Sequence, residues 1–317
     1  MNNTYIHNIG RIEFVVTYYC TGHCAHCSQG SCAHPGGHLS PAHAASVVEE
    51  ICAFNSLKSV MTFGGEPLLF PDTVCAIHSA AARRNVPVRQ LITNGFFSRD
   101  AAEIRRIAAM LADAGVNDLL LSADAFHQAA LPVEPVKLFA KAAAELIPVR
   151  LSPSWVVNRD FDCEYNRQTA AIVDSFRDIG IEPNAGNDIF LAGRAEKNLA
   201  QFYPDRRADL TERCGSQPYT MPLDDISELS IDPNGDVIFC SFRVGNILKT
   251  PLRKLLENYD PYSIPAISAL MTGGVSSLLE YAHSLGRPEL DRINADDFRS
   301  ACSLCRAIAA EINKNGG

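Results

Sequence analysis

Short apolar stretches alternate with longer amphipathic stretches up to residue 200, and this alternation narrows the folds open to the chain. β-Branched and aromatic residues predict strands at 12–17, 58–63, 86–93, 117–122, 148–157 and 181–191. Apolar residues at helical spacing predict helices between them at 41–51, 71–85, 100–115, 134–147 and 165–180. Six strands joined by five helices predict an α/β fold with a parallel sheet. We expect this sheet to close partway, as a partial (β/α)6 TIM-like barrel.

Two of the predicted helices begin with capping residues. Ser40 precedes Pro41, which is the usual order of an N-cap and a proline in the first helical turn. Asp100 and Glu103 have the spacing of a capping box, in which each side chain bonds to the other residue's backbone N–H. We therefore expect helices to start directly after Ser40 and Asp100.

Polar and glycine-rich segments follow the predicted strands. Folds of this type bind ligands at the carboxyl ends of their parallel strands, where such segments come together. Five segments fall at these ends: Cys20–Cys27, Gly64–Pro67, Asn94, Ser122–Asp124 and Leu191–Ala195. The sequence therefore predicts a functional site at this edge of the sheet.

Three cysteines stand close together in the first of these segments. Cys20, Cys24 and Cys27 lie within eight residues, and a loop with this spacing can hold three irons of an iron–sulfur cluster. The fourth iron would have no cysteine partner here and could coordinate a substrate or cofactor. The alternative is a zinc site, whose fourth ligand would be one of three nearby histidines, His23, His26 and His34.

Two motifs together resemble the radical S-adenosylmethionine (SAM) family. The C-x3-C-x2-C pattern of Cys20–Cys27 is that family's signature, and Gly64-Gly65-Glu66-Pro67 is similar to its GGEP motif. The resemblance implies a [4Fe–4S] cluster whose open iron binds SAM, with the GGEP motif holding the SAM amino group. Reduction of that cluster would cleave SAM to methionine and a 5′-deoxyadenosyl radical. The resemblance also suggests SAM contacts at His26, Asn94, Ser122, Asp124, Ser152 and Leu191.

Composition excludes several classes of protein. The chain has 317 residues and a net charge of −8, which argues against binding to nucleic acid through phosphates. No apolar run approaches the ~20 residues of a membrane helix, and the N-terminus lacks the pattern of a signal peptide. We therefore expect a cytoplasmic protein with no membrane partner, in which the eleven cysteines favour metal binding over disulfides.

The pattern changes after residue 200, so we predict a radical SAM core at 1–200 and a second domain at 201–317. A hairpin is predicted at 226–240, where Pro-Asn-Gly marks the turn. Helices are expected near 250–258 and 275–285, with a last helix opening at Cys302. Cys214, Cys240, Cys302 and Cys305 can hold a second cluster or a zinc ion. This layout is similar to the SPASM and twitch extensions of radical SAM enzymes, which implies one auxiliary [4Fe–4S] cluster.

Four cysteines remain. We expect Cys52 and Cys75 to be packing residues, because each adjoins the apolar face of a helix. Cys32 and Cys163 are either small filler residues or thiols that reach the cavity, and they are the candidates for a hydrogen donor. We expect His127, beside Asp124, to be a surface residue rather than a proton shuttle.

The family resemblance implies hydrogen-atom abstraction from an unactivated carbon, with an electron donor such as flavodoxin or ferredoxin. The layout looks like that of radical SAM peptide epimerases, so our leading hypothesis is a ribosomally made peptide substrate. In those relatives the hydrogen-donating cysteine follows the hairpin cysteine, but Ser241 stands there in this chain. Cys32 or Cys163 would then take that role, or the reaction is an oxidation, a crosslink or a thioether formation. The alternatives are a small substrate, such as an aminocyclitol or a cofactor precursor, and a non-catalytic iron protein.

Overall fold

The computed structural model describes residues 3–29, 37–212, 214–215 and 220–314. Cys32 and His34 lie outside these residues. The main sheet has eight strands in the order β10-β9-β8-β1-β2-β3-β4-β5. The strand bounds are β1 Ile6–Val15, β2 Ser59–Phe63, β3 Val88–Thr93, β4 Asp118–Leu121, β5 Val149–Leu151, β8 Ile226–Ile231, β9 Asp236–Phe239 and β10 Phe242–Asn246. Strands β1 to β5 are parallel, which confirms the α/β partial-barrel prediction.

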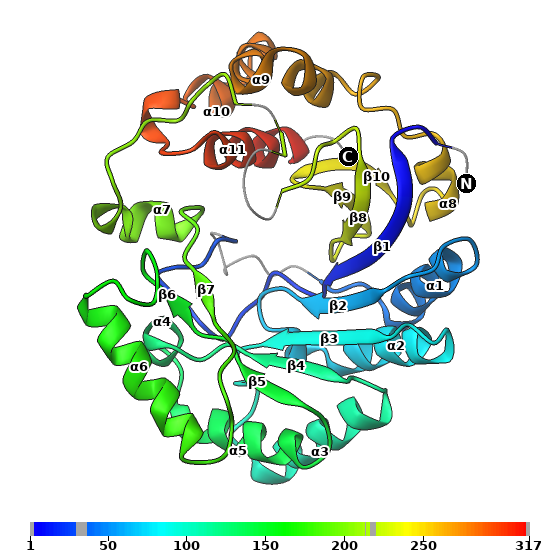
Figure 1. Ribbon diagram of the computed structural model, residues 1–317. Helices are drawn as coiled ribbons and strands as arrows, with labels where there is room; N and C mark the ends of the chain where they lie inside the picture. The colour runs from blue at the N-terminus through cyan, green and yellow to red at the C-terminus, as the bar shows by residue number, and fades with distance from the viewer. Residues whose placement is uncertain (1–2, 30–36, 213, 216–219, 315–317) are drawn as a thin grey trace.

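Helices cover the outer side of the parallel strands (Figure 1). This layer consists of α1 Pro41–Cys52, α2 Pro71–Arg83, α3 Ala101–Asp113 and α5 Val133–Ala144. The other α-helices are α4 Ala125–Gln128, α6 Glu164–Arg177, α7 Arg194–Asn198, α8 Leu252–Glu257, α9 Pro265–Ser284, α10 Pro288–Asp291 and α11 Ala301–Asn313. The apolar faces of α1, α2, α3 and α5 pack onto the sheet, as the helical spacing predicts. Within the described part of the chain, no helix is long and apolar enough to cross a membrane.

The end of the barrel is less regular than predicted. In place of long strands at 148–157 and 181–191, the chain forms β5 and a separate pair, β6 Ser154–Trp155 with β7 Asn187–Asp188. Pro153 separates β5 from β6, and Pro183 faces Leu151 in a single bridge. Proline has no N–H to donate to a ladder, so these strands are cut into short pieces.

The C-terminal hairpin continues the same sheet. Strands β8 and β9 pair antiparallel, as the predicted hairpin requires. Strand β8 also pairs in parallel with β1, so that Leu229 lies opposite Ile12 and Ile231 opposite Phe14. Side chains of β1, β8, α9 and α11 share one apolar cluster. Sheet and core thus run across residue 200, and the division at that residue stays a prediction.

The helix caps agree only in part with the sequence pattern. Ser40 accepts a hydrogen bond from His43 N, and Asp100 accepts one from Ala102 N at 2.9 Å. The prediction that the Glu103 side chain accepts a hydrogen bond from Asp100 N is wrong, because the Glu103 carboxylate pairs with Arg106 at 2.8 Å. Ser98 Oγ instead accepts the bond from Asp100 N. Arginine three residues along the same helix face competes successfully for the glutamate.

Replacing Asp100 with alanine is expected to lower the free energy of unfolding by about 1 kcal/mol, because the N–H of Ala102 loses its partner. The measurement is urea unfolding followed by circular dichroism. Glu103→Ala is the matched control and is expected to lower the free energy of unfolding measurably less, as for an exposed ion pair. A larger loss for Glu103→Ala than for Asp100→Ala would mean that the glutamate provides the cap.

Candidate functional site

The cysteine loop begins where β1 ends and brings two of its thiols to one side. Cys20 Sγ accepts hydrogen bonds from Gly22 N at 3.3 Å and from Asn94 Nδ2 at 3.6 Å. A Cβ atom placed on Gly22 would lie 3.3 Å from Cys24 Sγ and 3.8 Å from Cys20 Sγ. The two thiols therefore border the same small space, and N–H donors at a sulfur favour its thiolate form.

The segment after β7 holds the other side of this loop. Arg194 N donates to the Cys27 carbonyl at 2.9 Å, and Asn198 Nδ2 donates to the Ala25 carbonyl at 3.0 Å. Gly193 has a φ of +59°, and a Cβ there would lie 2.6 Å from Ser28 O. Leu191 packs against an apolar cluster that includes Cys24. The Leu191–Ala195 segment thus lies against the cysteine loop, where the strand-end argument predicts it.

The two glycines of the Gly64–Pro67 turn lie directly against the chain that follows β1. A Cβ on Gly64 would be 2.4 Å from Thr17 O, and a Cβ on Gly65 would be 2.1 Å from Tyr19 O. Gly65 N donates to Thr17 O at 2.7 Å. No side chain fits at either position, so the turn packs by its backbone against the chain that leads into the cysteine loop.

Glu66 is fully buried at the centre of this contact. Its Oε1 accepts hydrogen bonds from Leu68 N at 2.9 Å and Thr93 Oγ1 at 2.7 Å, and its Oε2 accepts one from Asn94 N at 2.9 Å. Burial raises the pKa of Glu66 to about 7 in spite of these donors. A carboxylate offers about four acceptor positions, so Glu66 has capacity for one more donor.

The polar residues predicted at the ends of the next strands make hydrogen bonds to different parts of the structure. Asn94 is buried, and its side chain accepts from Phe96 N at 2.8 Å while it donates to Cys20. Ser122 N donates to Thr93 O at 2.8 Å. Ser152 is buried, and its hydroxyl accepts from the side chains of Asn184 and Asn187. Asn94 therefore lies at the cysteine loop, whereas Ser152 is hydrogen-bonded to the segment around β7.

Asp124, His127 and His26 form a buried group that sequence reasoning captured only in part. The Asp124 carboxylate caps α4 and accepts a hydrogen bond from His127 Nδ1 at 2.9 Å. The His26 ring lies 4.9 Å from the His127 ring and 4.8 Å from that of Phe126. The side chain of His127 is only 14% exposed, so the surface interpretation is wrong. The Asp-x-x-His spacing, with aspartate as the N-cap of α4, was the available signal.

Electrostatics within this group follow from burial and from one carboxylate. Burial lowers the pKa of His26 to about 4. Burial by itself would lower the pKa of His127, but the charge of Asp124 and the hydrogen bond to it raise that pKa. Burial would likewise raise the pKa of Asp124, but His127 holds that pKa below its usual range. The aspartate is therefore ionised at neutral pH and fixes the orientation of the His127 ring.

The four C-terminal cysteines come together from three parts of the chain. Cys240 opens the two-residue turn between β9 and β10 with a φ of +55°, and Cys302 and Cys305 lie in the first turns of α11. A hydrogen bond from the Cys214 thiol lowers the pKa of Cys240. Burial, followed by the charge of Cys240, raises the pKa of Cys302 to about 11. All four residues line one cavity of about 1570 Å³.

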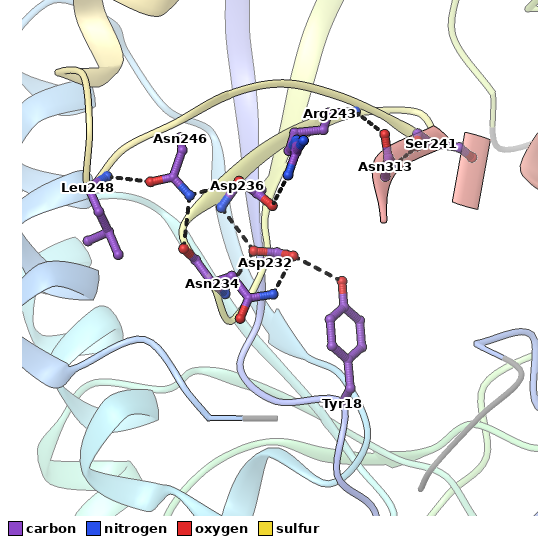
Figure 2. Close-up of polar contacts among 9 residues, drawn as sticks. All are labelled: Tyr18, Asp232, Asn234, Asp236, Ser241, Arg243, Asn246, Leu248 and Asn313. Carbon is purple, nitrogen blue, oxygen red and sulfur yellow. Dashed lines mark hydrogen bonds and ion pairs between the residues drawn. The ribbon is translucent and has the colours of Figure 1, made fainter. Parts of the chain in front are cut away.

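A polar network fixes the turn that carries Cys240 (Figure 2). Asn313, at the end of α11, donates to Ser241 O at 3.0 Å and accepts from Arg243 N at 3.3 Å. At the other end of the hairpin, Asp232 accepts from Asn234 N at 2.8 Å and from the Tyr18 hydroxyl at 3.4 Å. The hairpin is thus hydrogen-bonded to α11 and to Tyr18, which lies two residues before Cys20.

The cavity also reaches the sheet and the cysteine loop. Its lining includes Val15 and Phe63 at the ends of β1 and β2, and Ser28 just beyond Cys27. Cys163 is not among the described lining residues; it precedes α6 and is buried in the apolar cluster that contains Cys24. The cavity therefore extends from the edge of the cysteine loop to the four-cysteine group.

Comparisons with known proteins address the family and the fold. The profile described as the radical SAM superfamily matches residues 14–146. No curated protein matches the chain. SuiB of Streptococcus suis bound to S-adenosylmethionine has a TM-score of 0.55 and 13% identity, covering 94% of this chain and 77% of that one. SuiB bound to its precursor peptide SuiA has a TM-score of 0.53 and 11% identity, covering 81% and 66%.

A third solved structure, native anSMEcpe with bound AdoMet, has a TM-score of 0.47 and 15% identity, covering 78% of this chain and 80% of that one. At these identities the SuiB structures show a shared fold. The matched span contains both strand-end motifs, the cysteine loop and Gly64–Pro67. Residues 14–146 therefore form a radical SAM domain.

Proposed function

We propose that this protein is a radical SAM enzyme that cleaves SAM reductively and abstracts a hydrogen atom from a ribosomally synthesised peptide. The observation that carries the proposal is the contact between the Gly64–Pro67 turn and residues 17–19, which lead directly into Cys20–Cys27, within the matched span. Asn94 donates to both the Cys20 thiol and the buried carboxylate of Glu66 at the carboxyl edge of a parallel sheet. That edge is where such folds carry out their chemistry.

The residues at this edge fit a [4Fe–4S] cluster and SAM. Cys20, Cys24 and Cys27 would hold the cluster, and the N–H donors at Cys20 Sγ suit a ligating thiolate. When bound and reduced, the cluster supplies the electron that splits SAM into methionine and the 5′-deoxyadenosyl radical. Glu66 would receive the SAM ammonium group through its remaining acceptor position.

Other side chains would hold the nucleoside part of SAM. Asn94, Ser122 and Asp124 would offer polar contacts to it at the ends of β3 and β4. His26, Ser152 and Leu191 would lie farther along the same edge.

The four-cysteine group would hold one auxiliary [4Fe–4S] cluster. Cys214, Cys240, Cys302 and Cys305 supply the full thiolate set that such a cluster needs. Their place in the same cavity as the sheet edge would let the cluster accept an electron from a substrate radical. A flavodoxin or ferredoxin would supply the electron for the SAM-binding cluster.

One structural neighbour supports a peptide substrate. SuiB, which shares the fold, has been solved with its precursor peptide SuiA. Incubation with candidate precursor peptides, followed by mass spectrometry, tests the proposal. A product made only from an aminocyclitol or another small molecule would support the alternative substrate class.

The same experiment separates the possible reactions. Epimerisation leaves the peptide mass unchanged in ordinary water and adds one deuterium in heavy water, whereas oxidation and crosslinking remove two hydrogens. Cys163 is a poor candidate for a hydrogen donor because it is buried in an apolar cluster away from the cavity lining. Cys32 lies outside the described residues and remains a candidate for the hydrogen donor. Cys32→Ala is therefore the informative variant if the product is an epimer.

Replacing Cys214, Cys240, Cys302 and Cys305 with serine is expected to halve the iron content after anaerobic reconstitution, from about eight to about four per chain. The remaining iron belongs to the SAM-binding cluster, so 5′-deoxyadenosine formation from SAM should persist. The control replaces Cys52 of α1 and Cys75 of α2, which belong to neither proposed ligand set, and should keep about eight irons. An unchanged iron content in the fourfold variant would rule out the auxiliary cluster.

A further inference from the structure

Three potential metal ligands converge beside the cysteine loop in a combination that the cluster does not use. One ligand atom each from Cys24, His26 and His127 lies within 4.8 Å of the other two. The first two come from the loop after β1, and the third comes from α4. One thiolate and two imidazoles form a ligand set that Zn²⁺ and similar divalent ions favour.

Asp124 prepares His127 for such a role. The carboxylate is fully buried and receives the His127 Nδ1 at 2.9 Å, so Nε2 is the nitrogen left to bind an ion. Asp124 is itself held by Phe126 N at 2.9 Å and Ser154 N at 3.0 Å. A carboxylate that fixes the far nitrogen of a histidine is the usual outer support of a zinc ligand.

His26 offers an independent indication. The residue is partly buried, but its Nδ1 is fully buried and has no hydrogen-bond partner among the described residues. The other ring nitrogen, Nε2, is 3.4 Å from Ser154 Oγ. A buried polar atom without a partner is costly, and a metal ion at Nδ1 would remove that cost.

We propose that Cys24, His26 and His127 bind one Zn²⁺-class ion in the protein that lacks its SAM-site cluster. The ion would sit between Cys24 Sγ, His26 Nδ1 and His127 Nε2, with water as its fourth ligand. Small side-chain rotations would bring the three atoms to bonding distances of about 2.0–2.3 Å. Because Cys24 belongs to both ligand sets, the ion and the SAM-site cluster exclude one another. Bound zinc therefore blocks cluster loading at this site.

Cobalt titration of the metal-free, full-length protein under anaerobic conditions tests the site. The wild type is expected to bind two equivalents of Co²⁺, one at the four-cysteine group and one here. His127→Asn keeps a donor for Asp124 but lacks Nε2, and it should weaken one of the two sites by at least about tenfold. The absorption lost in the variant should be that of a single thiolate ligand. Equal binding by the wild type and the variant would overturn the proposal.

A second variant guards against misfolding of the first. His26→Gln keeps a polar atom near Ser154 but removes Nδ1, and it should weaken the same cobalt site by a similar factor. If His127→Asn fails to fold, as judged by circular dichroism, cobalt binding by His26→Gln is the measurement that tests the proposed site. Normal cobalt binding by a folded His26→Gln protein would refute the assignment.

Zinc competition tests the exclusion of the cluster. Wild-type protein loaded with two equivalents of Zn²⁺ should take up much less iron at the SAM site than zinc-free protein, and His127→Asn should recover most of that uptake. Equal iron uptake with and without zinc would refute the exclusion. SAM cleavage by zinc-free reconstituted protein is measured separately, so failure of the proposed enzyme activity and failure of this site are distinguishable.

Discussion

Joint replacement of Cys20, Cys24 and Cys27 with alanine is expected to abolish 5′-deoxyadenosine formation from SAM. The variant loses all the protein ligands proposed for the SAM-binding cluster, so iron after anaerobic reconstitution should fall from about eight to about four per chain. The measurements are iron content and chromatographic detection of 5′-deoxyadenosine after reduction with dithionite. Both signals must fall together, because SAM cleavage depends on an electron from that cluster.

The matched control replaces Cys52 and Cys75 with alanine. Both side chains lie in apolar packing clusters, and Cys75 Sγ contacts Met110 O at 3.6 Å. This control should retain its iron and its SAM cleavage. Full SAM cleavage by the triple variant would contradict the proposed function outright, whatever the state of the four-cysteine group.

Glu66→Gln is expected to destabilise the protein by about 1–3 kcal/mol and to weaken SAM binding by at least about tenfold. The carboxylate accepts donors at both oxygens, whereas an amide has only one oxygen. In either orientation, the NH₂ group of glutamine therefore faces a buried donor. Thermal unfolding and SAM titration of the reconstituted enzyme measure the two effects. Glu103→Gln on the surface of α3 is the control and should change neither quantity appreciably.

The pH dependence of SAM binding should report the same residue. The pKa of Glu66 is raised from 4.5 to about 7 by burial, so without SAM the residue keeps its proton up to near neutrality. Its contribution to the stability of the SAM-free protein therefore falls as pH rises from 4.5 to about 7. An ammonium group favours the ionised form, so SAM affinity should rise with pH up to about 7 and then level off. A rise of the same size in Glu66→Gln would show that another group titrates.

Local sequence patterns predicted the elements that have strong local causes. The helix after Ser40 and the hairpin turn at Pro-Asn-Gly form where expected, because capping and turn chemistry depend on neighbouring residues. Each of these features is encoded within a few residues of the place where it appears.

Features that depend on distant partners escaped prediction. Helix α4 has only four residues, too few for an apolar period, so hydrophobic patterning could not predict the burial of His127, and only the Asp-x-x-His spacing pointed to it. Glu103 was assigned to the wrong partner because Arg106 competes for it. The pairing of β8 with β1 joins segments more than two hundred residues apart, and alternation within either strand does not specify its neighbour.

That pairing has a consequence for the nascent chain. Strand β1 is made early, but one of its two edges has no partner until β8 leaves the ribosome. At synthesis rates of about 5–20 residues per second, that edge waits roughly ten to forty seconds. An open strand edge invites pairing with other chains, so chaperones would have their main task on this protein during that interval.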